Sequence, residues 1–444
     1  MIGTSGDTYV PVCRARSSLI EYDGRSFRRF YKQAQMGAHV GERYPLQAKR
    51  RPKFEEGAGS LRVVDLFAGC GGLTLGIAQA AHKRDVSLDV RLAVDFEAAP
   101  TKVFKANFPK ANVQEGTVES YFDGDLGASL TAQEAKTLAM VGEVGLLIGG
   151  PPCQGHSNLN NHTRRDDPKN RLYLRMARAV EVLRPRAVVI ENVLAVVSDK
   201  QQVVSRAIVH LKKLGYEVAT SRIDLLKLGV AQTRKRHILM AIREDALPFG
   251  FSAADLLQIE DHKATPHDLR WAIGDLLEVR PKSFFDEAAV PNADNQRRMK
   301  YLFENDEHNL PNEERPECHQ GEHNYTSMYG RLWWDRPAQT ITSGFATMGR
   351  GRFVHPEVPR CLTAHEAARI QGFPDYFKFV DERVKPRYEL TRTEVQIIIG
   401  NAVPPPLTEA LTSKLFDAEV LLAKDDASQL PDDDFAASAV DLAC

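Results

Sequence analysis

The sequence predicts an α/β fold whose doubly wound, mostly parallel sheet is covered by helices on both faces. Apolar runs that end in glycine or an acid recur at Arg62–Phe67, Val90–Val94, Val144–Ile148, Ala187–Ile190 and Arg236–Ile242. Helical patterns lie between several of these runs, at Gly72–His82, Leu172–Leu183 and Val203–Leu214. A strand buried on both faces is a continuous rather than an alternating apolar run, as in a parallel sheet. Alternation of such strands with helices indicates the doubly wound architecture.

The chain is expected to divide into five parts. They are a basic extension (1–60), the α/β domain (61–243), a smaller irregular domain (244–360), a return to the first domain (361–415) and an acidic tail (416–444). The regular pattern dissolves after about residue 244, where Pro, Asp, Glu and His become frequent. It returns at Thr363–Gln371, where Thr363 and Glu366 form a capping box that predicts a helix.

The composition is that of a soluble globular protein, with 43% hydrophobic and 26% charged residues. No run reaches the roughly 18 apolar residues of a membrane span, and six scattered cysteines indicate a reducing cytoplasm rather than a disulfide framework. The net charge is −1, but the charges are unevenly distributed: residues 1–60 carry 11 Lys and Arg against 6 Asp and Glu. The Lys49–Lys53 run there is either a DNA-binding arm or part of a flexible lead.

A glycine-rich turn follows the first predicted strand, at Phe67-Ala68-Gly69-Cys70-Gly71-Gly72. Its glycines allow a ligand to approach the backbone, and the helix that begins there offers N–H groups to an anion. The spacing differs from a dinucleotide fingerprint, which leaves a carboxylate such as the methionyl end of S-adenosylmethionine as a candidate anion. Asp95 closes the next strand, where an acid can accept both ribose hydroxyls. A purely structural strand–turn–helix is the alternative.

Cys153 lies in Gly149-Gly150-Pro151-Pro152-Cys153-Gln154-Gly155, directly after the strand Val144–Ile148. Ligands of doubly wound sheets bind beyond the carboxyl ends of the strands, which is where this segment falls. Glycine, proline and polar neighbours are unlike the surroundings of an inert core cysteine, so Cys153 is a candidate nucleophile. Its attack at neutral pH needs a nearby cation or a helix N-terminus, because a free thiol has a pKa of about 8.5.

Two further sites bring charge to the same sheet edge. Glu191 ends an apolar strand, where a carboxyl group can act as an acid; a capping or salt-bridged glutamate is the alternative. Alternation along Gln232-Thr233-Arg234-Lys235-Arg236 sends Arg234 and Arg236 to one side and Lys235 to the other. Two guanidinium groups suit a phosphate, a base carbonyl or a carboxylate such as Glu191. A solvated basic turn is the alternative here.

The order of these motifs resembles that of the DNA (cytosine-5) methyltransferase family. It runs F-x-G-x-G-G, P-P-C-Q, E-N-V, Q-x-R-x-R and Gly400-Asn401-x-Val403. The similarity extends from about Leu61 to Leu415 and includes Arg331–Ser343 (RLWWDRPAQTITS) and Cys361–Asp375 (CLTAHEAARIQGFPD). The resemblance implies the S-adenosylmethionine-dependent methyltransferase fold, with 61–243 as the catalytic domain and 244–360 as a target-recognition domain.

The resemblance also implies a reaction, in which S-adenosylmethionine donates a methyl group to carbon 5 of a cytosine flipped out of double-stranded DNA. Cys153 adds to carbon 6 of the base as covalent nucleophile. Glu191 protonates or hydrogen-bonds the ring at N3 and the amino group. Arg236 holds the ring oxygen and orients Glu191, and Arg234 lies near the thiolate and a backbone phosphate.

Cofactor and DNA contacts follow from the same resemblance. The expected cofactor-binding residues are Phe67, Ala68, Gly69, Gly71, Gly72, Asp95, Phe96, Thr117 and Asn401. The expected DNA-binding residues are Gln154, Ser157, Arg164, Arg165, Thr340, Ser343, Arg350 and Arg352. Residues 154–171 resemble the loop that closes over the flipped base, with an ordinary surface loop as the alternative. Residues 343–352 resemble a base-reading loop in which Arg350 or Arg352 takes a guanine edge.

Three positions depart from the family pattern. Asp95 stands where Glu is more usual, Thr117 where Asp is usual and His156 where Phe is usual. None takes part in the covalent chemistry, so an active enzyme is expected. The alternatives are a tRNA cytosine-5 methyltransferase and a catalytically silent DNA-binding relative. The long insert 243–326 argues against the first, and the intact catalytic residues argue against the second.

The expected partners are double-stranded DNA and, in a restriction–modification pair, a cognate restriction endonuclease that acts separately. The protein is expected to be a monomer in the bacterial cytoplasm, associated with the nucleoid and not with a membrane. His308, Cys318, His319 and His323 lack the paired-cysteine spacing of a zinc site, so no metal is expected. Residues 246–330 carry 8 basic against 16 acidic side chains, so most of that segment should face away from DNA.

Overall fold

The computed structural model describes residues 45–152, 171–261, 265–321, 327–380 and 390–421. Internal contacts divide the chain into residues 1–45 and residues 46–444, and the fold below is that of the second unit. None of the helices in these ranges is both long and apolar enough to cross a membrane.

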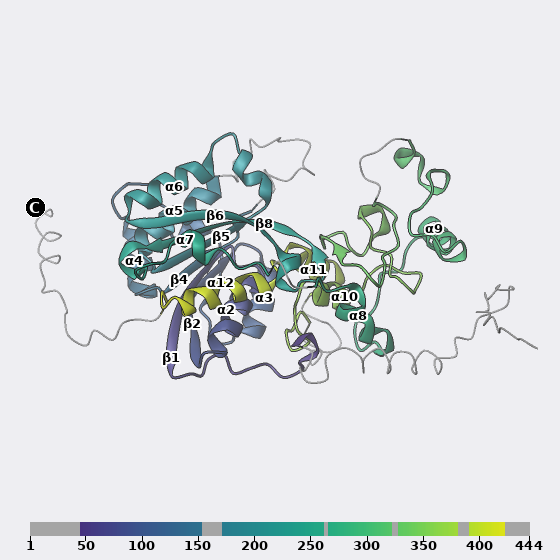
Figure 1. Cartoon of the computed structure of the whole chain (residues 1–444), viewed down its shortest axis with the longest axis horizontal. Coiled ribbons are helices and arrows are strands. Elements are labelled where there is room, and N and C mark those ends of the chain that lie inside the picture. Colours follow the sequence, from purple (N-terminus) through teal and green to yellow (C-terminus); the bar gives the residue numbers. More distant parts are fainter. Residues whose placement is uncertain (1–44, 153–170, 262–264, 322–326, 381–389, 422–444) are drawn as a thin grey trace, which may run out of the picture. The chain divides into compact units, whose positions relative to one another are not determined.

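The centre of the unit is a seven-stranded sheet in the order β3-β2-β1-β4-β5-β8-β6 (Figure 1). Its strands are β1 (Gly59–Leu66), β2 (Val86–Asp95), β3 (Val113–Glu115), β4 (Leu146–Gly149), β5 (Ala187–Asn192), β6 (Tyr216–Asp224) and β8 (Lys235–Arg243). Strands β1 to β5 are parallel, and β8 runs antiparallel to both β5 and β6. All six residues of β5 are buried, which explains its uninterrupted apolar run.

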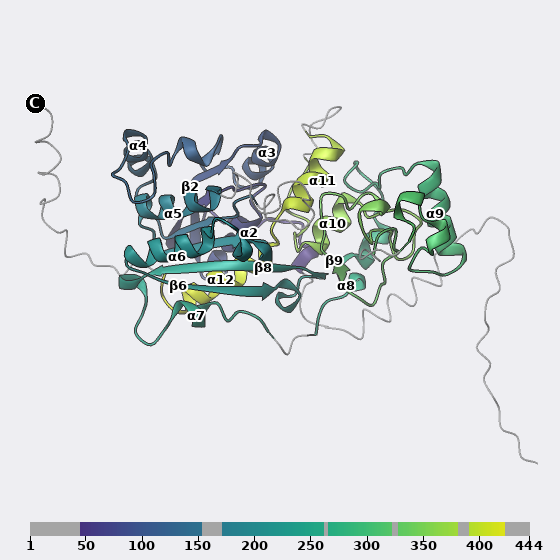
Figure 2. The ribbon, with the colours of Figure 1, turned by 90° about the horizontal axis from the view of Figure 1, so that it is seen from above.

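Helices cover both faces of the sheet (Figures 1 and 2). One buried cluster joins the sheet to α2 (Gly72–His82), α3 (Ala98–Asn107) and α12 (Pro405–Asp417). The other joins it to α4 (Ala132–Val141), α5 (Leu172–Leu183) and α6 (Val203–Lys213). The predicted doubly wound, mostly parallel α/β fold is thus confirmed, and the bounds of α2 and α5 are those that the apolar periodicity predicts.

Capping boxes fix where three helices begin. Thr131 with Glu134, Thr363 with Glu366 and Thr391 with Glu394 form the reciprocal hydrogen bonds at the starts of α4, α10 (Ala364–Ile370) and α11 (Arg392–Asn401). Each box satisfies backbone N–H groups that have no partner inside the helix. The last helix, α12, returns to the first layer, where Thr408 Oγ1 donates to the Leu73 carbonyl of α2 at 2.7 Å.

The segment after β8 contains short helices and 3₁₀ turns rather than a second large sheet. Its helices are α7 (Ala253–Leu256), α8 (Leu269–Ile273) and α9 (Ala293–Glu304), and β7 (Gln232–Thr233) pairs in parallel with β9 (Ala338–Gln339). A separate buried cluster forms here around Leu302, Tyr329 and Val354. Helix α9 was not expected from the polar sequence; Asn292 caps it by accepting the N–H of Asn295 at 2.9 Å.

The last part of the expected N-terminal extension packs onto the α/β domain. Phe54 is 1% exposed, and its ring lies 6.4 Å from that of Phe108 and 6.3 Å from that of Tyr376. Arg51 Nε donates to the Asn107 carbonyl at the end of α3, at 2.8 Å. Arg51 therefore fixes structure, and the Lys49–Lys53 run is not a free arm. Residues 46–58 differ from the expectation because one buried aromatic anchors an otherwise polar stretch.

The start of the expected acidic tail also packs. Val420 is fully buried and Leu421 is 5% exposed, and Arg186 Nε donates to the Val420 carbonyl at 2.8 Å. Residues 416–421 thus differ from a solvated tail. Residues 422–444 lie outside the described part of the chain.

Candidate active site

The glycine-rich turn links the end of β1 to the start of α2. Gly69 and Gly71 have φ angles of +54° and +87°, and Phe67 shares the left-handed region at +59°. A Cβ on Gly71 would lie 2.9 Å from the ring of Phe104, so a larger residue does not fit. A Cβ on Gly69 would meet nothing within 4 Å. The turn is therefore tightly packed behind Gly71 and open at Gly69, as a backbone that receives a ligand must be.

Asp95 is fixed beside this turn at the end of β2. Its Oδ2 accepts the Gly69 N–H at 2.8 Å and its Oδ1 accepts the Glu97 N–H at 3.0 Å. Burial raises the pKa of this carboxyl group above its usual range, against the effect of those hydrogen bonds. The next side chain, Phe96, is 59% exposed. A fixed carboxylate, an exposed aromatic ring and an open glycine fit the ribose, adenine and methionyl parts of S-adenosylmethionine.

Thr117 and Asn401 complete the set of expected cofactor contacts. Thr117 follows β3, and its hydroxyl lies 3.0 Å from that of Ser120. Asn401 is the exposed last residue of α11. The chain that follows it packs closely on α2, since a Cβ on Gly72 would lie 2.4 Å from the Val403 carbonyl oxygen. Residues 401–403 thus lie near the start of α2, together with the ends of β1, β2 and β3.

The approach to Cys153 is described as far as Pro152; Cys153 itself, with Gln154, Ser157, Arg164 and Arg165, lies outside the described residues. Asn192 Nδ2 donates to the Pro151 carbonyl at 3.1 Å. A Cβ on Gly150 would lie 3.2 Å from Glu191 Oε2. Glu191 and Asn192 at the end of β5 therefore contact the chain directly before the expected nucleophile.

Glu191 forms an ion pair with Arg236. Arg236 Nε lies 2.6 Å from Glu191 Oε1, and the two side chains are 14% and 8% exposed. The contact is an ion pair, and within the described residues Glu191 Oε1 accepts no hydrogen bond. In the β5–β8 register Glu191 lies opposite Ile238, so Arg236, two residues earlier, returns to the same face. Of the partners considered for this arginine from sequence, the carboxylate is the one found.

Arg234 differs from its expected place. It lies between β7 and β8, so the strand alternation assumed for it does not apply. Its side chain is buried, and its Nη1 and Nη2 donate to the carbonyls of Ile341 and Ala402, each at 3.1 Å. Because these bonds occupy a buried guanidinium, the arrangement does not support a phosphate contact. Arg234 instead ties Ile341 to the end of α11.

A buried amide network reinforces that connection and was missed from the sequence. Gln232 Oε1 accepts the Ile341 N–H at 3.0 Å, and its Nε2 donates to Gln371 Oε1 at 2.8 Å. Gln371 in turn donates to the Ile399 carbonyl at 2.6 Å. Gln232 is the first residue of the Q-x-R-x-R motif, which is the only signal that the sequence offers for it. The network holds Ile341 by both its N–H and its carbonyl.

The expected DNA-contacting residues of this segment lie on both sides of Ile341, with Thr340 before it and Ser343, Arg350 and Arg352 after it. Thr340 Oγ1 donates to the Thr233 carbonyl at 2.9 Å. Ser343 is exposed, and its backbone rests on Gly400, where a Cβ would lie 2.1 Å from Ser343 N. Arg350 is exposed at the end of a 3₁₀ turn, Met348–Arg350. Thr340 thus fixes the base of the loop, while Arg350 is available to a ligand.

Arg352 is engaged within the protein instead. Its Nη2 donates to Asn309 Oδ1 at 2.5 Å and its Nη1 donates to the Arg331 carbonyl at 3.1 Å. Its guanidinium carbon lies 4.3 Å from the centre of the Trp333 ring. The structure therefore separates the two arginines that the sequence left equivalent. No group of three or more His, Cys, Asp and Glu side chains is placed to hold a metal within the described ranges.

Comparison with known proteins adds the following. The model of the C-5 cytosine-specific DNA methylase family matches residues 61–417. The Type II methyltransferase M1.BsuMI of Bacillus subtilis is 41% identical over 369 residues, which cover 82% of this chain and 83% of the relative. The rice DNA (cytosine-5)-methyltransferase 1A is 28% identical over 462 residues, or 84% of this chain and 29% of that much longer protein.

Among solved structures, the Dnmt2 methyltransferase of S. pombe superposes with a TM-score of 0.56 at 17% sequence identity. The superposition covers 80% of this chain and 98% of that one. At this identity the similarity concerns the fold, and it agrees with the seven-stranded sheet covered by helices.

Proposed function

The chain belongs to the C-5 cytosine-specific DNA methylase family and is a DNA (cytosine-5) methyltransferase, and we propose that it methylates a flipped cytosine within a specific duplex sequence through a covalent adduct of Cys153. The observation that carries this proposal is the Glu191–Arg236 ion pair, which lies beside the Gly150–Pro152 chain that leads to Cys153. A protonatable carboxyl group oriented by a guanidinium, next to a nucleophile, is what activation of a cytosine ring requires.

In the proposed reaction the Cys153 thiolate forms a bond from Sγ to carbon 6 of the base. The electron pair of the C5–C6 double bond moves toward N3, where Glu191 donates a proton. Carbon 5 becomes nucleophilic and accepts the methyl group. A base then removes the carbon-5 proton, its electron pair restores the C5–C6 double bond, and Cys153 leaves as thiolate. The N3 proton returns to Glu191.

Arg236 is proposed to orient Glu191 and to hold the ring oxygen of the base. Its ion pair fixes one carboxylate oxygen, Oε1, while the other, Oε2, lies on the side of Gly150. Arg234 is proposed to act indirectly, by donating hydrogen bonds to the carbonyls of Ile341 and Ala402. This assignment replaces the phosphate contact expected for Arg234 from the family resemblance.

S-adenosylmethionine, when bound, supplies the electrophilic methyl group. The residues proposed to hold it are Phe67, Ala68, Gly69, Gly71, Gly72, Asp95, Phe96, Thr117 and Asn401. In support, Gly69 is open to a ligand and the Asp95 carboxylate is held beside it by the Gly69 N–H. The exposed ring of Phe96 offers a surface for a purine.

The DNA substrate must open locally, because the duplex hides carbon 6 within the base stack; methyltransferases in general flip their target base. Thr340, Ser343 and Arg350 are proposed to contact the DNA. The relationship to Type II methyltransferases suggests a separately encoded restriction endonuclease of the same specificity. A monomer in the bacterial cytoplasm, close to the nucleoid, is the corresponding setting.

Bisulfite sequencing of plasmid DNA from cells that express the protein tests the proposal and identifies the target. We expect 5-methylcytosine at one sequence, and none with the Cys153→Ala variant. Methylation of tRNA with an unmethylated plasmid would favour an RNA substrate. Absence of methylation in both nucleic acids, from a folded protein that binds DNA, would indicate a catalytically silent relative.

A further inference from the structure

Trp333 is surrounded by cations in a part of the target-recognition domain that the proposed reaction does not use. The guanidinium carbons of Arg352 and Arg336 lie 4.3 and 4.5 Å from the centre of its ring. The ring of His308 stacks on it at 4.7 Å, with the two planes 18° apart. The neighbouring Trp334 contacts an arginine, Arg270, at 5.2 Å, and its Nε1 donates to Glu357 Oε2 at 3.0 Å. Adjacent indoles thus have different partners.

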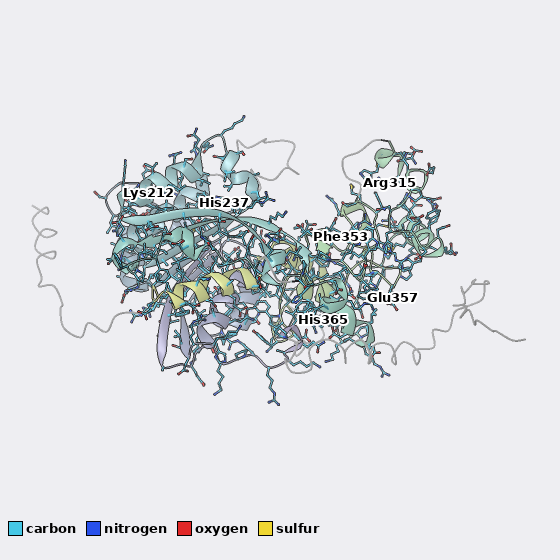
Figure 3. The ribbon with its side chains drawn as sticks, in the orientation of Figure 1. Lys212, His237, Arg315, Phe353, Glu357 and His365 are labelled. Carbon is cyan, nitrogen blue, oxygen red and sulfur yellow. The ribbon has the colours of Figure 1, made fainter. Side chains whose placement is uncertain are left out.

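Arg352 is the inner cation of this group. Besides Asn309 and the Arg331 carbonyl, its Nη1 donates to the His308 carbonyl. A side chain on Gly330 would collide with it, since a Cβ there would lie 2.5 Å from Nη1. Burial, together with the charges of Arg336 and Arg315, lowers the pKa of Arg352 to about 10. Arg352 is therefore a fixed support, held close to two other positive charges (Arg315 is labelled in Figure 3).

Arg336 is the outer cation. It is exposed, and among the described residues its guanidinium makes no hydrogen bond or ion pair. Two other arginines of this domain have carboxylate partners: Arg331 pairs with Asp306 at 3.2 Å and Arg297 pairs with Glu314. The preceding segment 246–330 has twice as many acidic as basic residues. Arg336 nevertheless has no carboxylate partner among the described residues. In the part of the chain that the structure describes, the Arg336 guanidinium is held by the ring of Trp333.

A guanidinium stacked on an aromatic ring keeps its N–H groups in the plane of the fork, where they can meet two oxygens of one phosphate. Like charges gathered without counter-charges also raise the free energy of the unbound protein, which a bound anion lowers. We propose that Arg336, held on the Trp333 ring that Arg352 also contacts, binds a phosphate of the DNA backbone. The proposal rests on the proposed function in taking duplex DNA as the ligand.

The test measures the affinity of the full-length protein for a labelled duplex of arbitrary sequence over a series of salt concentrations. Each protein–phosphate contact contributes about −0.9 to the slope of log K against log salt. Arg336→Gln should therefore reduce the steepness by about 0.9, so that the loss of affinity between 50 and 200 mM salt becomes about 3.5-fold smaller. Arg336→Lys keeps the charge and should keep most of the slope.

Arg297→Gln is the matched control, because it removes an exposed arginine whose charge Glu314 already neutralises. Trp333→Leu tests the positioning role: it should reduce the slope with Arg336 intact, and adding Arg336→Gln to it should change little more. An unchanged slope in Arg336→Gln, or an equal change in Arg297→Gln, would overturn the phosphate site. If the variants change the slope as predicted but the wild-type protein methylates no DNA, the proposed function is overturned and the phosphate site stands.

Discussion

Glu191 and Arg236 face each other from neighbouring antiparallel strands, with Arg236 Nε 2.6 Å from Glu191 Oε1. The other carboxylate oxygen lies toward Gly150, three residues before Cys153. The pair therefore lies beside the chain that leads to the proposed nucleophile, and in the described residues it forms no hydrogen bond or ion pair with the glycine-rich turn. Changes at Glu191 should act on the chemical step rather than on cofactor binding.

Glu191→Gln should slow methyl transfer by about 10²–10⁴-fold, the usual cost of a lost general acid, because an amide cannot supply the proton at N3. Single-turnover kinetics with saturating cofactor measure this step, and the affinity for S-adenosylmethionine should change little. Glu143→Gln is the matched control, since Glu143 pairs with Arg62 at 3.2 Å on the exposed surface. Near-normal turnover in Glu191→Gln would show that the ion pair is structural only.

Cys153→Ser should abolish methyl transfer while leaving the melting temperature and cofactor affinity close to those of the wild type. The wild-type protein should form a complex that resists denaturant with DNA containing 5-fluorocytosine. Fluorine there replaces the carbon-5 proton whose removal would release Cys153. Electrophoresis under denaturing conditions detects the complex. If an active preparation forms no such adduct, the thiolate mechanism is wrong.

Asp95→Ala should weaken S-adenosylmethionine binding at least about 10-fold, since each hydrogen bond lost to a charged group is worth about 1.5–3 kcal/mol. Part of the loss comes from the turn, because Asp95 also accepts the Gly69 N–H. Calorimetric titration measures the affinity. Asp89→Ala on the same strand is the control, as Asp89 pairs only with the surface residue Arg91. Equal affinities in both variants would place the cofactor elsewhere.

The sequence predicted the parts of this molecule that local patterns determine. Helices α2 and α5 have the predicted bounds, α5 because apolar residues repeat at helical spacing and α2 because a run of apolar and small residues follows the glycine-rich turn. The start of α10 follows from its capping box, which involves residues three apart. The glycine-rich turn follows β1 and Glu191 lies near the end of β5, as the strand pattern predicted; carboxyl ends of parallel strands meet at one sheet edge, and the roles of these residues stay predictions.

The parts that failed depend on partners distant in sequence. Arg234 was given the alternation of a continuous strand, but the chain turns between β7 and β8, and its two carbonyl partners lie 107 and 168 residues away. Phe54 is a single aromatic in a polar stretch, and periodicity does not detect a single anchor. Arg350 and Arg352 look alike in sequence because only the folded positions of Asn309 and Trp333 distinguish them.

Arg350→Ala should relax the methylated sequence at one base position, because an exposed guanidinium can discriminate a guanine edge by about 1–3 kcal/mol. Arg352→Ala should instead lower the stability of the protein by about 1–3 kcal/mol, through its lost internal hydrogen bonds. Bisulfite sequencing reads the first effect and thermal unfolding the second. A relaxed target with normal stability in Arg352→Ala would reverse these roles.

His365, which is labelled in Figure 3, links Asp286 to Asp375 through its two ring nitrogens. Its Nδ1 lies 2.8 Å from Asp286 Oδ1 and its Nε2 lies 2.9 Å from Asp375 Oδ1. Both ring nitrogens can donate only in the charged imidazolium form. Burial alone would lower the pKa of His365, but the hydrogen bonds to Asp286 and Asp375 outweigh burial and raise it; the nearby Arg369 opposes them.

This arrangement predicts how stability depends on pH. A histidine whose pKa is raised by folding stabilises the protein fully below its unfolded pKa of about 6.5, and that contribution is lost as the pH rises through the folded value. Between the two values the folded protein holds one more proton, so stability should fall by about 1.4 kcal/mol per pH unit from this group. Urea unfolding at several pH values above 6.5 measures the slope. His365→Asn should be less stable at pH 6.5 and should lack this part of the slope; parallel curves for the variant and the wild type would mean that His365 is not the charged link.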